Sequence, residues 1–420
     1  MAAYARPVAQ RPPDVVAPPP GNPRFPLLDP LRAIAALAIV VTHTAELGGF
    51  NTAHALGAWT VRLDCGVAVF FVLSAFLLYR PFVSARLDGR RGPRIGRYAR
   101  RRALRILPGY WVACIALGLL APQYTPGMFG PHWWVYFGLV QSWSKGTIIQ
   151  GIGVAWSLSV EAMFYCALPL YALAMARLLR GRDRDAQARL ELRLLAASAV
   201  VALIVRTLWH VIWPTSVFGN QFPGTWTWFT GGLALAVASS WLKGRPVAAL
   251  PWLARTATER PLAWWAASFG FLTLSAWGVG LPRMPFSPTS TASLQAQHVL
   301  YALTAICLVA PMVFHDGRRS LPARVLSTRL LAWLGLVSYG IFLYHQPLVF
   351  EFIDTRLWLP AMGWAFYTLL VAAGATAIAA ASYYLVERPL LRYKEPQRAG
   401  GTGGASARSR AQAVAAKPES

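Results

Sequence analysis

Apolar stretches long enough to cross a lipid bilayer recur along almost the whole chain, and this feature most limits what it can fold into. They follow one another from Leu27 to Leu385, and each is roughly 20 residues long, the length that a helix needs to span the hydrocarbon core. No sizeable soluble domain fits between them. The sequence therefore predicts an all-α, polytopic membrane helix bundle.

Composition and charge support a lipid environment. Apolar residues make up 56% of the 420 residues and charged residues only 13%, about half of the roughly 25% typical of soluble domains. The formal charge of +24 could suggest nucleic-acid binding, but the basic residues sit in short loops between apolar spans, where positive charge sets membrane orientation. The expected partner is the lipid bilayer, not nucleic acid.

The four cysteines are scattered through apolar segments. They have neither the pairing of a disulfide framework nor the spacing of metal ligands, so we expect no metal site. They are Cys65, Cys114, Cys166 and Cys307.

Ten segments are candidate transmembrane helices, and an eleventh is ambiguous. The ten lie near residues 27–50, 64–84, 105–122, 153–178, 193–213, 226–242, 261–280, 297–314, 330–352 and 361–386. The ambiguous segment, 132–143, is shorter than a bilayer-spanning helix needs to be.

Arginine-rich loops decide how the ambiguous segment is interpreted. Arginines crowd residues 86–105 and again residues 177–193, and the positive-inside rule assigns both stretches to the cytoplasm. The chain must cross the membrane an even number of times between them, so we interpret 132–143 as a re-entrant or interfacial helix. The resulting topology has both termini in the cytoplasm and places the protein in the cell (inner or plasma) membrane.

The two ends of the chain differ in composition from the membrane body. Residues 1–26 are rich in Pro, Ala and Val, and residues 394–420 in Gly, Ala, Ser and Arg, which predicts a disordered cytoplasmic arm and a disordered cytoplasmic tail. Residues 27–393 then form one membrane domain. No cleavable signal peptide is recognised at the start.

Ionisable side chains inside spans are costly and usually face a functional site. Arg32 and His43 are eleven residues apart, close to three helical turns, so they share one face with an axial offset of roughly 16 Å. That offset suits an extended donor such as acyl-coenzyme A, whose phosphates Arg32, Arg102 and Arg105 could hold. The alternatives are a snorkelling Arg32 and a purely topological role for the other two arginines.

His43 lies too deep to snorkel, and a neutral imidazole there could act as general base toward an acceptor hydroxyl. Glu46, one turn further on, could orient the ring. Glu161 and His345 lie at depths where both could meet His43 and complete a buried polar site. A structural hydrogen bond between helices is the alternative for these two residues.

Six segments, in order, are similar to those of a known family. They are LDPLRAIAALAIVVTH (28–43), FFVLSAFLLYRPF (70–82), RRALRILPGYW (101–111), WSLSVEAMFY (156–165), SYGIFLYHQPL (338–348) and YYLVERPLLR (383–392). Through them residues 27–393 resemble the bacterial acyltransferase-three family of membrane O-acyltransferases. Pro30, Ala75, Ala162 and Met163 depart from the family pattern, and none of them removes a candidate catalytic group.

The resemblance implies roles for the polar residues. The matching histidine, His43, is the catalytic base in the family, and Glu161 falls on its recurrent glutamate. Arg32, Arg102 and Arg105 match arginines associated with the acyl-coenzyme A co-substrate. Trp156, Ser157, Tyr344 and His345 lie in the same segments, and with Glu46 they are the side chains predicted to support the site.

The expected function is transfer of an acyl group, with acetyl the favoured one, from acyl-coenzyme A to a hydroxyl of a carbohydrate or secondary metabolite. No permanently bound cofactor is expected. The alternative is a transporter or flippase of a glycan or small molecule, because buried His, Glu and Arg also serve proton relays. Against it, the chain lacks the paired broken helices common in transporters.

Overall fold

The computed structural model describes residues 25–214, 217–284, 287–317, 320–354, 363–391 and 393. The predicted tail and residues 1–24 of the predicted arm lie outside these ranges.

The fold is all-α, with no strand in the described part of the chain. Its helices are α1 (Leu28–Leu47), α2 (Phe50–Ala53), α3 (Gly57–Thr60), α4 (Gly66–Leu87), α5 (Ile95–Leu120), α6 (Trp133–Phe137), α7 (Trp156–Leu178), α8 (Arg184–Ile212), α9 (Phe222–Trp241), α10 (Trp252–Glu259), α11 (Pro261–Trp277), α12 (Thr291–Val313), α13 (Leu321–Leu326), α14 (Arg329–Asp354), α15 (Gly363–Ser382) and α16 (Arg388–Leu391).

Helices lie at all ten predicted positions. Eight helical segments of the described chain are long and apolar enough to cross a membrane, and they contain α1, α4, α5, α7, α8, α12, α14 and α15. The other two predicted spans correspond to α9, with 20 residues, and α11, with 17. The segment 132–143 holds only the five-residue α6 and a short 3₁₀ turn, too short to cross a bilayer.

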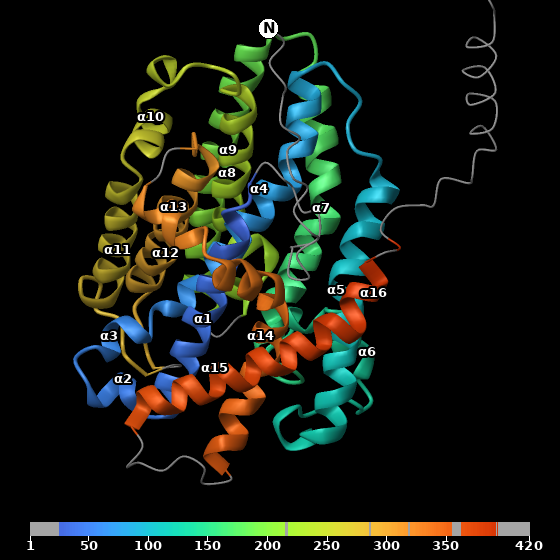
Figure 1. Cartoon of the computed structure of the whole chain (residues 1–420), viewed down its shortest axis with the longest axis vertical. Coiled ribbons are helices and arrows are strands. Elements are labelled where there is room, and N and C mark those ends of the chain that lie inside the picture. The colour runs from blue at the N-terminus through green and yellow to red at the C-terminus, as the bar shows by residue number, and fades with distance from the viewer. Residues whose placement is uncertain are drawn as a thin grey trace, which may run out of the picture.

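The bundle has inner and outer helices (Figure 1). In the segment that contains α4, 78% of the most apolar stretch is buried inside the protein, whereas the corresponding share for α8 is 6%. The first helix, α1, packs against α4, α14 and α15. Since α8 offers its apolar side chains to lipid while α1 and α4 are enclosed, polar groups on α1 and α4 face the protein interior.

A glycine lets α4 and α9 approach closely. A Cβ atom added at Gly232 would lie 2.2 Å from the Val72 carbonyl oxygen and 2.7 Å from the Ala75 Cβ atom. Small residues permit such approaches between membrane helices. Ala75, where the family usually has glycine, is thus accommodated by a glycine on the facing helix.

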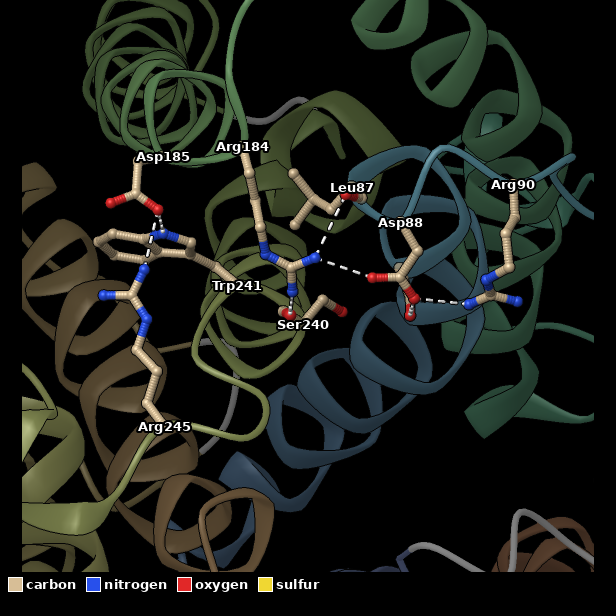
Figure 2. A network of polar contacts seen from close by, with 9 residues as sticks. Leu87, Asp88, Arg90, Arg184, Asp185, Ser240, Trp241 and Arg245 are labelled. Carbon is tan, nitrogen blue, oxygen red and sulfur yellow. Dashed lines mark hydrogen bonds and ion pairs between the residues drawn. The ribbon is translucent and has the colours of Figure 1, made fainter.

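Three loops predicted to be cytoplasmic meet at one end of the bundle (Figure 2). Arg184 at the start of α8 binds Asp88 at the end of α4 (2.8 Å) and the Ser240 carbonyl of α9 (2.6 Å). The hydrogen bonds from Arg90 and Arg184 lower the pKa of Asp88 to about 2, so the carboxylate stays charged at neutral pH. Beside it, Asp185 accepts hydrogen bonds from Trp241 and Arg245.

The opposite loops also meet each other. Arg62 donates to the Pro282 carbonyl (2.6 Å), and Arg283 donates to the His54 carbonyl (3.2 Å). The two sets of loops that the positive-inside rule separated therefore gather separately in the fold.

Candidate active site

The predicted donor-binding arginines line one pocket that is open to the surface. Arg32 comes from the first turns of α1, Arg102 and Arg105 come from α5, and Glu161 and Ser157 come from α7. Three helices distant in sequence thus bring a predicted set of charges together. A pocket with several guanidinium groups suits a ligand rich in anionic or carbonyl oxygens.

Carboxylates balance part of this positive charge. Arg32 forms an ion pair with Asp29 (2.8 Å), and Arg105 lies 3.7 Å from the buried Glu387. Glu387 ends a π-helical turn, Tyr383–Glu387, that follows α15; such turns often occur at functional sites. Two of the three inner arginines are therefore already engaged with acidic side chains.

Glu161 is held on the opposite wall of the pocket. Its carboxylate accepts a hydrogen bond from the Ser74 hydroxyl of α4. The Arg102 guanidinium lies 5.9 Å from the centre of the Tyr165 ring, one turn beyond Glu161 on α7. The pocket thus contains a carboxylate with a fixed partner and a guanidinium above an aromatic ring.

His43 pairs with His345 across α1 and α14. The His43 Nδ1 atom lies 2.9 Å from the His345 Nε2 atom, and the ring planes differ by 23°. His345 is completely buried, whereas His43 keeps partial exposure. The structure therefore brings together the two histidines that the sequence placed at similar depth.

Hydrogen bonds assign the tautomers of the two neutral rings. The His345 Nδ1 atom lies 2.8 Å from the Phe342 carbonyl oxygen and 3.2 Å from that of Ile341. A carbonyl can only accept, so this nitrogen carries the proton and the His345 Nε2 atom must accept. His43 then donates from Nδ1, which leaves a lone pair on its Nε2 atom. This is the protonation state that a general base needs.

One side chain is shared by the pocket and the histidine pair. Phe342 lines the pocket, and its ring centre lies 5.9 Å from that of His345. His43 is not among the residues that line the pocket. Because α1 carries both Arg32 and His43, the two parts of the site remain fixed relative to each other.

The remaining predicted residues have other surroundings. Ser157 lines the pocket and donates to the Val154 carbonyl (3.1 Å), whereas Trp156 packs against the main apolar core. The buried Tyr344 hydroxyl donates to Ser382 (3.4 Å). The Glu46 side chain makes no hydrogen bond or ion pair with any described residue, so His345 is the side chain that holds the His43 ring.

Sequence reasoning did not assign roles to several residues of the site. Ser74, Tyr165, Tyr339, Phe342 and Glu387 line the pocket or bind a residue that does. Each lies inside one of the six family-like segments, and that was the available signal. Tyr339 also donates to the Ile106 carbonyl (2.9 Å), which joins α14 to α5.

A multi-pass bundle of apolar helices that encloses a polar pocket defines an integral membrane protein. The sequence profile described as "Acyltransferase domain" matches residues 26–384. Since this is most of the chain, the protein belongs to the acyltransferase-three family and is a membrane acyltransferase.

Several curated relatives are similar along most of the chain. The peptidoglycan O-acetyltransferase OatA of Listeria monocytogenes is 21% identical over 87% of this chain, which spans 55% of that protein. The exopolysaccharide production protein ExoZ of Rhizobium meliloti is 28% identical over 85% of this chain and 96% of its own length. The acyltransferase MdmB of Streptomyces mycarofaciens is 34% identical, over 36% of this chain and 40% of its own length. No solved structure matches significantly.

Proposed function

We propose that this protein transfers an acyl group, with acetyl the favoured one, from acyl-coenzyme A to a hydroxyl group of a carbohydrate or secondary metabolite. The observation that carries the proposal is the chain of hydrogen bonds from the Phe342 carbonyl through His345 to His43. His43 lies on α1, and the other end of α1 contributes Arg32 to the pocket. Two relatives, a peptidoglycan O-acetyltransferase and an exopolysaccharide production protein, favour a carbohydrate acceptor.

The proposed reaction uses His43 as general base. The His43 Nε2 atom takes the proton of the acceptor hydroxyl as the oxygen attacks the thioester carbonyl carbon. The new C–O bond forms and the C–S bond breaks. The proton then passes from the imidazolium to the departing thiolate. His345, through its own Nδ1–H bond to a carbonyl, keeps the His43 Nδ1 proton in place, so that the lone pair lies on Nε2 whenever the His43 ring is neutral.

Sidedness and activity can be tested together with membrane vesicles. We propose that both termini and the arginine-rich face are cytoplasmic, as the basic loops at one end of the bundle support. Inside-out vesicles given acetyl-coenzyme A and glycan fragments should release free thiol in step with acetylation of the glycan. Right-side-out vesicles should not use donor added outside. Movement of glycan without thiol release would instead identify a transporter.

Glu161 is our second proposed catalytic residue. It lines the pocket together with Arg32, Arg102 and Arg105 and accepts a hydrogen bond from Ser74. Glu161→Gln keeps the size but removes the charge, and we expect transfer to fall about tenfold or more, the cost of unbalancing a buried charge. The initial rate of thiol release measures the effect, and a rate equal to that of the wild type would exclude the role.

A further inference from the structure

A second, wider pocket lies beside the first at the arginine-rich end. It is open to solvent. Arg91, Arg94, Arg97, Arg101 and Arg102 line it, together with an apolar wall that includes Pro81, Phe82, Pro93 and Tyr98. We refer to it as the vestibule. Arg102 lines both cavities, so the vestibule and the inner pocket adjoin at this side chain.

The arginines form a continuous row along α5. At 100° per residue, positions 97, 98, 101, 102 and 105 fall on one helical face, whereas Arg100 lies off it; Arg94 directly precedes the first residue of the helix. The row runs from the exposed Arg94 and Arg97 to the half-buried Arg102 and Arg105. Positive-inside charge alone requires no such alignment, because any position in the loop would satisfy it.

Three arginines of the vestibule have no acidic partner among the described residues. Arg91, Arg94 and Arg97 form no ion pair with a described residue, and no Asp or Glu lines the vestibule. By contrast, Arg32 and Arg105 in the inner pocket have carboxylates beside them. The first turn of α5 also contains no acidic residue and no side-chain cap, so its free N–H groups add positive potential. The vestibule therefore contains three arginines, Arg91, Arg94 and Arg97, whose charge no described carboxylate balances.

The aromatic wall narrows the class of ligand. The rings of Phe82 and Tyr98 meet edge to face, with their centres 5.7 Å apart. The Tyr98 hydroxyl is anchored on the Tyr165 carbonyl (3.1 Å), which fixes the ring at the junction with the inner pocket. An apolar, aromatic surface next to several guanidiniums suits a planar base joined to phosphates better than a phosphate alone.

We propose that the vestibule binds the nucleotide head of the acyl donor and that only the uncharged thioester arm enters the inner pocket. This inference rests on the proposed use of acyl-coenzyme A. Phosphate groups are costly to bury among apolar helices, and here they stay at the solvent-open end. Arg94 and Arg97 bind phosphate, and Arg102 marks the neck between the two cavities.

The direct test is binding of adenosine 3′,5′-bisphosphate to purified protein in nanodiscs. The wild type should bind it, and the double variant Arg94→Ala/Arg97→Ala should lose about tenfold or more in affinity, because charge-assisted bonds to phosphate are strong. Arg100→Ala, on the same helix but outside the vestibule, is the matched control and should bind as the wild type does. No binding by the wild type, or an equal loss in the control, would overturn the assignment.

An anionic phospholipid headgroup offers the same phosphate chemistry without the base. Nanodiscs of phosphatidylglycerol should compete weakly with the nucleotide relative to nanodiscs of phosphatidylcholine. If the anionic lipid displaces the nucleotide completely, the vestibule is a lipid site and the proposal fails.

Measuring turnover with two different donors distinguishes a failure of the nucleotide-site proposal from a failure of the proposed function. The double variant should raise the KM for acetyl-coenzyme A and leave turnover of S-acetylpantetheine, which lacks the nucleotide, unchanged. Equal effects on both donors would exclude a nucleotide site. If the wild type binds the nucleotide but transfers nothing from acetyl-coenzyme A, the proposed donor is wrong while the nucleotide site stands.

Discussion

Replacement of His43 with alanine is expected to reduce acyl transfer by about 10²- to 10⁴-fold, the usual contribution of a positioned general base. The variant removes the only proposed proton acceptor for the incoming hydroxyl. Donor binding should persist, because the arginine pocket does not include His43. The initial rate of thiol release, with the KM for acetyl-coenzyme A measured in parallel, gives both quantities.

The control for this variant is a histidine away from the site. His132→Ala changes an exposed side chain just before α6 and should leave the rate and the elution volume on size exclusion unchanged. A His43 variant that is correctly assembled and still turns over at the wild-type rate would disprove the mechanism.

Replacement of His345 should have the second largest effect. His345→Leu removes the acceptor for the His43 Nδ1 proton, so that His43 is free to adopt the tautomer with its proton on Nε2. We expect kcat to fall by roughly two orders of magnitude or more, since loss of the tautomer-fixing partner of a catalytic histidine costs about 10⁴-fold in the Ser-His-Asp triad. The KM for the donor should change little.

A conservative replacement distinguishes this positioning role from simple packing. The side-chain oxygen of glutamine can reach the place of the imidazole Nε2 atom, so His345→Gln should recover part of the activity that His345→Leu loses. Equal rates in the two variants, at equal thermal stability, would show that His345 serves only to fill space.

The fold followed from the sequence because two of its determinants are local. The length and apolarity of a segment decide whether it can span the bilayer, and the arginines of its loops decide on which side they lie. The shortness of segment 132–143 and the basic loop around Arg184 were therefore sufficient to predict that this segment does not span the membrane. The depth and charge of a residue can also be inferred from its position along its own helix. The sequence alone therefore predicted that Arg32 and Arg102 share one site.

Depth alone did not determine which buried groups meet. His345 and Glu161 both had depths compatible with His43, but the rotation of each helix about its axis depends on tertiary packing. In the structure α14 directs His345 toward His43, while α7 directs Glu161 toward Ser74 and the arginines. The π-helical turn that brings Glu387 to Arg105 has no recognisable sequence signal. In the sequence alone, the vestibule arginines do not differ from arginines that only set the membrane orientation.

The histidine pair joins residues that are 302 positions apart in the chain. The ribosome makes α1 first and α14 only after most other spans have been inserted, so a growing chain contains His43 long before it contains the partner that sets its tautomer. The reactive centre is consequently completed by one of the last steps of membrane assembly. The pocket is completed equally late, because Ser338, Tyr339 and Phe342 of α14 line it beside Arg32 and Arg102.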